Sequence, residues 1–181
     1  MVRGDKADEA ISYLSRATVL LARGDPGAAT KEAEKARVFI DASVYVAAAR
    51  SPTGGSSLVL EMLKAHPSYR GVASRLVLLE AERNIQAKFG ETELARFYRS
   101  LADVDPQMVS TPPADSLRDA SNLVGEKDAH VLAAAVAANC AFLVTLDRAA
   151  FLTERVLSAG LPLRPLTPGD FLNEVLSRRR R

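Results

Sequence analysis

The sequence predicts an α/β domain built around a mainly parallel β-sheet. Two continuous apolar runs, 38–40 and 142–146, consist largely of strand-forming residues, and each ends at an aspartate, Asp41 or Asp147. Such unbroken runs are typical of central parallel strands that are covered on both faces. Helical segments follow both runs, and this alternation of strands with helices favours a parallel sheet over a purely helical scaffold.

The remaining elements are predicted from periodicity and from turn residues. A helical hairpin is expected over residues 5–36, because leucines and alanines recur at helical spacing around a Gly-Asp-Pro-Gly break. Ser74 is a suitable N-cap for the helix that follows it, and Pro168 occupies a favoured early position in the last helix. Further helices are expected at 44–49, 55–65, 75–88, 91–101, from Asp128 through HVLAAAVAANC, and at 148–158, and further strands at 71–73, 104–109 and 163–166.

Three parts are expected along the chain: an N-terminal helical extension (1–36), the main α/β domain (37–177) and a basic tail (178–181). The alanine pattern of the extension resembles half of a tetratricopeptide-type repeat, but a single copy lacks the stacked neighbours that stabilise such repeats. A helical extension of the main domain is therefore the favoured interpretation. The four arginines of the tail are interpreted mainly as a solvated terminus, with phosphate binding as the alternative.

Composition excludes several classes of site. The chain has 181 residues, 48% of them apolar and 25% charged, with a formal net charge of +2, which is ordinary for a globular domain. Its single cysteine, Cys140, excludes an internal disulfide and favours a reducing, cytoplasmic setting. Two histidines and one cysteine are too few for a typical zinc site, so a metal would be held by carboxylates, which favour Mg²⁺ or Mn²⁺. No signal peptide or membrane-spanning segment is expected.

Four acidic residues are candidates for one site. Asp41 and Asp147 follow directly on predicted strands, and sites in open α/β sheets form at the carboxyl ends of the strands. Glu80 and Asp128 lie on predicted helices. Clustered carboxylates repel one another, and a divalent cation removes that repulsion. Taken singly, each acid also has a simpler interpretation, as a turn residue, a helix cap or a solvated side chain.

Three stretches of the sequence resemble the PIN-domain family, especially the VapC-type toxin ribonucleases of bacterial toxin–antitoxin systems. They are VFIDASVYVAAA, which contains Asp41, SRLVLLEAERNI, which contains Glu80, and EKDAHVLAAAVAANCAFLVTLDRAAF, which contains Asp128 and Asp147. The ending PLTPGDFL is similar to the family's last strand and helix, so the resemblance covers residues 37–176. Glu82 is the alternative to Glu80 as the helix carboxylate. Residues 1–36 lie outside the family pattern.

The resemblance implies a PIN-like three-layer α/β/α fold and hydrolysis of RNA phosphodiester bonds with Mg²⁺ or Mn²⁺. It implies that Asp41 and Asp128 are the main metal ligands, and that Glu80 and Asp147 bind a second ion or orient the attacking water. The implied partners are an RNA substrate, a small antitoxin protein and a second copy of the chain in a homodimer.

Five other residues of these stretches have expected roles. The hydroxyls of Ser43 and Thr145 either support the metal site or cap the local backbone. Arg148 is a weak candidate for a phosphate contact, and pairing with a nearby acid is the alternative. A structural or solvent role is favoured for His130 over that of a general base. It lies two residues after Asp128, and positions i and i+2 of a helix do not share a face. Cys140 is expected to be a buried small apolar residue.

Other functions stay open at this stage. The chain is expected to be a toxin ribonuclease, but an RNA-maturation nuclease would use the same acids, and a PIN-fold protein- or RNA-binding module with little catalysis is a further alternative. A phosphatase-type hydrolase with Asp41 as nucleophile is disfavoured, because Ser43 occupies the position of the second aspartate. We also hypothesise that residues 1–36 limit access to the catalytic groove, so that their deletion raises nuclease activity.

Overall fold

Five parallel strands form the centre of the molecule in a computed structural model that describes residues 35–178. The strands are β1 (Ala36–Ile40), β2 (Tyr69–Ser74), β3 (Gln107–Val109), β4 (Phe142–Val144) and β5 (Arg164–Leu166), and their order across the sheet is β3-β2-β1-β4-β5. The predicted parallel sheet is therefore confirmed. The predicted helical hairpin and the last three residues of the basic tail lie outside the described residues.

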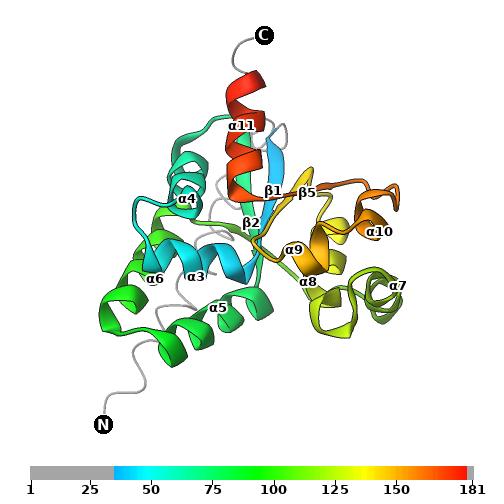
Figure 1. Cartoon of the computed structure of the whole chain (residues 1–181), viewed down its shortest axis with the longest axis horizontal. Helices are drawn as coiled ribbons and strands as arrows, with labels where there is room; N and C mark the ends of the chain where they lie inside the picture. The colour runs from blue at the N-terminus through cyan, green and yellow to red at the C-terminus, as the bar shows by residue number, and fades with distance from the viewer. Residues whose placement is uncertain (1–34, 179–181) are drawn as a thin grey trace, which may run out of the picture. The chain divides into compact units, whose positions relative to one another are not determined.

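Helices cover both faces of this sheet, which confirms the predicted three-layer architecture. Figure 1 shows α3, α4, α5 and α6 on one side of the sheet and α7, α8, α9 and α10 on the other. This division follows from right-handed crossovers, since the chain moves outward from β1 to β3 and then returns to β4 and β5. The helices are α3 (Ala42–Arg50), α4 (Gly55–Ala65), α5 (Arg75–Lys88), α6 (Glu91–Val104), α7 (Ala114–Val124), α8 (Glu126–Ala137), α9 (Arg148–Phe151), α10 (Glu154–Leu157) and α11 (Pro168–Arg178).

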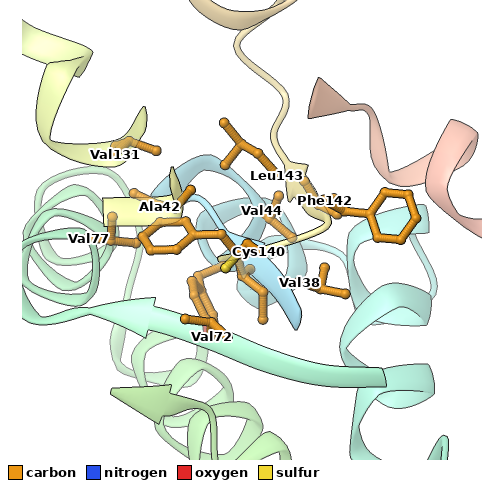
Figure 2. Packing of buried hydrophobic residues seen from close by; sticks show 14 of the residues in the cluster. Val38, Ala42, Val44, Val72, Val77, Val131, Cys140, Phe142 and Leu143 are labelled. Carbon is orange, nitrogen blue, oxygen red and sulfur yellow. The ribbon is translucent and has the colours of Figure 1, made fainter. Parts of the chain in front are cut away.

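The two predicted apolar strands form the middle of the core. Val38, Phe39 and Ile40 of β1 are fully buried, as are the residues of β4 beside them. Side chains of consecutive strand residues point to opposite faces, so complete burial requires helices on both sides. Figure 2 shows Val38 and Phe142 packed in this core together with Cys140. Cys140 is buried, which confirms its prediction as a buried small apolar residue, and burial raises the pKa of its thiol to about 12.

Two helix starts agree with their predicted signals. Ser74 caps α5, with its hydroxyl accepting a hydrogen bond from the Val77 amide at 3.4 Å. Pro168 is the first residue of α11, where its missing amide hydrogen has no cost. None of the described helices is long and apolar enough to cross a membrane.

Several element boundaries differ from the sequence prediction. The predicted helix at 148–158 is two short helices, α9 and α10, because Thr153 caps a new helical turn by accepting from the Val156 amide. The strand predicted at 142–146 ends at Val144, and the next two residues form a turn. Helix α8 begins at Glu126, so Asp128 lies in its first turn, and the alternative of Asp128 as an N-cap is wrong.

Helix α7 lies in a segment to which the sequence analysis assigned no element. Its signals were nevertheless present, because Pro113 precedes the first turn and Asp115 lies within that turn. Leu117, Ala120 and Leu123 recur at helical spacing and pack against the core. The helix supports the crossover from β3 to β4 and packs against α8.

Gly71 of β2 lies where the surrounding side chains leave little room for a larger residue. A methyl group at this position would lie 3.0 Å from a Val104 methyl group and 3.3 Å from the Ile40 side-chain end. Gly71→Ala should therefore destabilise the fold by about 1–3 kcal/mol through overpacking. Urea unfolding measures this change. Gly55→Ala is the control, since its added methyl meets only Pro168 at 3.8 Å and should leave stability unchanged or slightly raised; equal effects of the two substitutions would contradict the packing argument.

Candidate active site

The pairing of β1 with β4 brings two of the predicted acids to one edge of the sheet. Ile40 pairs with Val144, and the Asp41 amide donates to the Val144 carbonyl at 3.1 Å. Asp41 follows β1 directly, and Asp147 follows β4 after a short turn. The carboxyl ends of neighbouring parallel strands lie side by side, so residues far apart in the chain meet here.

Two hydroxyl groups connect these strand ends. Thr145, fully buried, donates to Asp41 Oδ2 at 2.9 Å and accepts from the Asp147 amide at 3.0 Å. Ser43 also donates from its hydroxyl to Asp41 Oδ2, and it accepts from the Leu146 amide at 3.0 Å. Each hydroxyl thus links the Asp41 carboxylate to the turn that carries Asp147. The contacts extend beyond the local capping that was the alternative for both residues.

The Asp41 carboxylate is held from one side. It is 6% exposed, and Oδ2 receives the two hydroxyls as well as the Ser43 amide at 3.3 Å. None of the residues between 35 and 178 donates to Oδ1 by a hydrogen bond. One oxygen is therefore immobilised, and the other is available to a cation or a water. Asp147 also has a capping role, because its Oδ1 accepts from the Ala150 amide at 2.9 Å.

Asp128 lies within the electrostatic field of both other aspartates. Partial burial raises the pKa of its carboxyl group, and the negative charges of Asp147 and Asp41 raise it further. Lys127 and His130 oppose these effects. The three aspartates therefore act on one region at the carboxyl edge of the sheet, although they come from β1, α8 and the turn after β4. The neighbouring negative charges thus disfavour the ionised form of Asp128.

Glu80 lies beside this group on α5, and its contact is with His130. The His130 Nε2 atom is 4.0 Å from Glu80 Oε2, and its other ring nitrogen is 3.0 Å from the Lys127 carbonyl. His130 thus contacts Glu80 and also acts electrostatically on Asp128. The sequence did not indicate the contact between His130 and Glu80, because it joins two helices, α8 and α5, that come together only in the folded chain.

Glu82 is directed elsewhere. It accepts a 2.6 Å hydrogen bond from the Tyr98 hydroxyl on α6 and contacts Gln86 at 3.2 Å on its own helix. Burial and the Glu82 carboxylate raise the pKa of the Tyr98 hydroxyl, so this bond persists at neutral pH. Of the two glutamates, Glu80 is the one whose contacts lie toward Asp128.

Arg148 follows Asp147 at the start of α9 and is exposed. Its main-chain amide donates to the Leu146 carbonyl at 3.0 Å, which closes the turn after β4. A guanidinium at this place adds positive charge next to the acidic edge.

Comparisons with known proteins agree with this arrangement. A family model described as PIN domain matches residues 37–149. The chain belongs to the PIN-domain family. The matched segment contains Asp41, Glu80, Asp128 and Asp147. No curated protein matches the sequence.

Two solved structures share the fold of this PIN domain. PAE2754 from Pyrobaculum aerophilum aligns with a TM-score of 0.53 and 19% identity, over 78% of this chain and 96% of that one. The other is the crystal structure of VapBC2 from Rickettsia felis bound to a DNA fragment from their promoter. One of its chains aligns with a TM-score of 0.54 and 16% identity, over 72% of this chain and 98% of that one.

PIN domains are generally nucleases that use divalent metal ions, and the donors present here suit such ions. The candidate ligands are carboxylates, the hard oxygen donors that Mg²⁺ and Mn²⁺ prefer. Among residues 35–178, there is no group of three or more His, Cys, Asp or Glu side chains that could hold a metal ion. Mg²⁺ does not require one, since it typically keeps several waters and uses one or two carboxylates with substrate phosphates. The available Oδ1 of Asp41 and the repulsion acting on Asp128 fit this kind of site.

The Thr145 hydroxyl should be required for the stability of this PIN domain. Thr145→Val removes one donor to the buried Asp41 carboxylate and the acceptor for the Asp147 amide, at nearly constant volume. We expect a loss of roughly 1–3 kcal/mol in the free energy of unfolding. Thr145→Ser keeps the hydroxyl and should retain most of that stability. Chemical denaturation compares the three proteins, and a loss for Thr145→Ser as large as that for Thr145→Val would contradict the argument that the hydroxyl is the group that matters.

Proposed function

We propose that this PIN domain is a metal-dependent endoribonuclease that hydrolyses RNA phosphodiester bonds. The observation that carries the proposal is the position of Asp41 and Asp147 at the carboxyl ends of the paired strands β1 and β4, with Asp128 within the electrostatic field of both. Helix capping accounts for contacts of Asp41 and Asp147, but it does not account for the position of Asp128, whose ionised form is disfavoured. A carboxyl group in such a position is expected where a cation and a phosphate are to be bound.

Each acid has a proposed role that its surroundings support. Asp41 and Asp128 are the main ligands of Mg²⁺ or Mn²⁺, because Asp41 offers one oxygen without a protein donor and Asp128 is repelled by both neighbours. Asp147 and Glu80 bind a second ion or orient the attacking water. Ser43 and Thr145 are positioning residues that hold the Asp41 carboxylate by its Oδ2 atom.

The chemistry divides between the ion and the chain. A bound divalent ion would supply Lewis-acid activation of the phosphoryl group and of water. The protein holds the carboxylates in place, and Asp147 or Glu80 accepts the proton that the attacking water releases. The exposed Arg148 guanidinium contacts the RNA phosphate backbone.

The biological setting that the resemblance favours is the toxin of a toxin–antitoxin pair. The fold of the VapBC2 chain is consistent with this proposal. The proposed partners are a small antitoxin protein and a second copy of the chain, and the proposed location is the cytoplasm, which suits the unpaired Cys140. An RNA-maturation nuclease is the alternative, since it would use the same site.

The nuclease proposal is tested by incubating labelled total RNA with the folded wild-type protein and with Asp128→Asn, in Mg²⁺, Mn²⁺ or excess chelator. We expect metal-dependent cleavage that falls by more than about 100-fold in the variant, because even outer partners of metal sites contribute 10–100-fold. Cleavage that survives both chelator and substitution would refute the carboxylate mechanism. A folded wild-type protein that cleaves no RNA with either ion would favour the binding-module alternative.

The two glutamates of α5 provide a matched pair of variants. Glu80→Gln should lower the cleavage rate, because it removes a carboxylate in contact with His130, whose ring acts on the charge of Asp128. Glu82→Gln should change the rate by less than about twofold, because its remaining oxygen still accepts from Tyr98, away from the site. Initial rates at saturating metal give the comparison. The reverse order of effects would assign the helix carboxylate to Glu82.

Metal binding should also be visible as a gain in stability. At about ten times its dissociation constant, Mg²⁺ should raise the melting temperature by about 3–6 °C, since it binds the folded state. Asp41→Asn and Asp128→Asn should lose most of this gain. Without metal, Asp128→Asn should melt higher than the wild type, because it removes repulsion from Asp147 and Asp41. Thermal melts with matched NaCl measure both effects, and equal Mg²⁺ shifts in all variants would place the ion elsewhere.

A further inference from the structure

A cavity of about 220 Å³ adjoins the carboxylate group, by which we mean the four candidate acids Asp41, Glu80, Asp128 and Asp147. The mechanism above does not use this cavity. It is formed where β2 and β3 end, between the start of α5, the segment after β3 and α8. The side chains that line it include Arg75, Leu76, Val109, Ser110, Thr111 and His130. It is smaller than the roughly 300–1,000 Å³ typical of sites for drug-sized ligands, so its occupant is a small group or part of a larger molecule.

His130 connects this cavity with the carboxylate group. The imidazole lines the cavity, lies 4.0 Å from Glu80 and acts on the charge of Asp128. Both sites also lie at the same edge of the sheet, because all strands are parallel and their carboxyl ends face one way. A chain-like ligand whose reacting group lies at the aspartates would therefore reach the cavity with its neighbouring unit.

The lining residues define the chemistry of that unit. Arg75 and His130 offer nitrogen donors, and Arg75 carries a positive charge, while none of the described residues that line the cavity is a carboxylate. Ser110 and Thr111 offer hydroxyls that both donate and accept. Leu76, which is 47% exposed, and Val109 provide apolar surface. An unpaired nucleotide needs this combination: an apolar or guanidinium plane for the base, hydrogen-bonding groups for its edge and its 2′-hydroxyl, and positive charge for the phosphate.

We propose that this cavity is a subsite for one unpaired nucleotide of the RNA, next to the phosphate that is cleaved. The inference rests on the proposed function and deepens it, because it assigns the place at which one base of the substrate is recognised. Bases within an A-form helix are stacked and paired, so a double-stranded substrate could not place one base in the cavity. Arg75 and Ser110 would then contribute to affinity and to the choice of cleavage position.

Binding is measured separately from cleavage in the full-length Asp128→Asn protein. Fluorescence anisotropy follows short fluorescein-labelled single-stranded RNA of each homopolymer and a double-stranded RNA of equal length, with Mg²⁺ at physiological salt. To this background we add Arg75→Ala, which removes the cavity's guanidinium, or Ser110→Phe, which fills it. Arg83→Ala is the matched control, because Arg83 is an exposed arginine on the same helix α5 and does not line the cavity.

We expect Arg75→Ala and Ser110→Phe to weaken single-strand binding by about tenfold, and Arg83→Ala by less than about twofold. In the cleavage-competent protein, sequencing of the RNA ends should show a base preference at one position beside the cut. Ser110→Phe should abolish that preference, and cleavage at other positions should persist.

The failures are distinguishable. Equal binding by all the variants, with an unchanged base preference, would overturn the cavity inference and leave the nuclease proposal intact. Tighter binding of double-stranded RNA would also overturn it. If neither the parent nor Arg83→Ala binds RNA, and the cleavage-competent protein cleaves none, both the proposed function and the subsite are wrong.

Discussion

The pairing of β1 with β4 is the constraint on which the remaining structure depends. It places the Asp41 amide against the Val144 carbonyl and allows the Thr145 hydroxyl to reach Asp41 across more than a hundred residues of sequence. Both strands are covered on both faces, so a change in their relative position would disturb the whole core. The geometry of the candidate site is thus determined by the most buried part of the molecule, while the site itself lies at the edge.

At the carboxyl edge of the sheet, carboxyl groups of like charge lie within one another's electrostatic field. Asp128 is partly desolvated and lies in the field of two other carboxylates, which makes its charged form less stable than in water. The core and the hydroxyl network hold the acids in place despite this repulsion. Such a conflict between local stability and position is expected at functional sites, where a ligand supplies the missing charge. A divalent cation and an RNA phosphate together would satisfy the requirement.

At this edge, His130 lies between two regions of different chemistry. On one side are carboxylates, which suit a metal ion, and on the other is the cavity with its arginine, hydroxyls and apolar surface. A polymer with alternating phosphates and bases matches this order of groups. The comparison structures share the fold at 16–19% identity, so the differences that select a substrate are expected in such surface residues rather than in the sheet.

Much of the architecture could be predicted from the sequence, because it depends on local signals. The apolar runs before Asp41 and Asp147 indicated buried parallel strands, and Ser74 and Pro168 marked helix starts that the structure confirms. Short-range features were less predictable: helix α7 was not assigned, and the break at Thr153 was not foreseen, since caps and amphipathic spacing compete with other signals over a few residues. The sequence by itself determined the fold class through residue type and spacing, and its resemblance to the PIN-domain family indicated the family and the candidate acids. Only the tertiary structure decided that Ser43 and Thr145 hold Asp41, that Glu80 rather than Glu82 contacts His130, and that a cavity adjoins the acids. The physical reason is that these contacts join separate elements, and their distances depend on how the helices pack on the sheet.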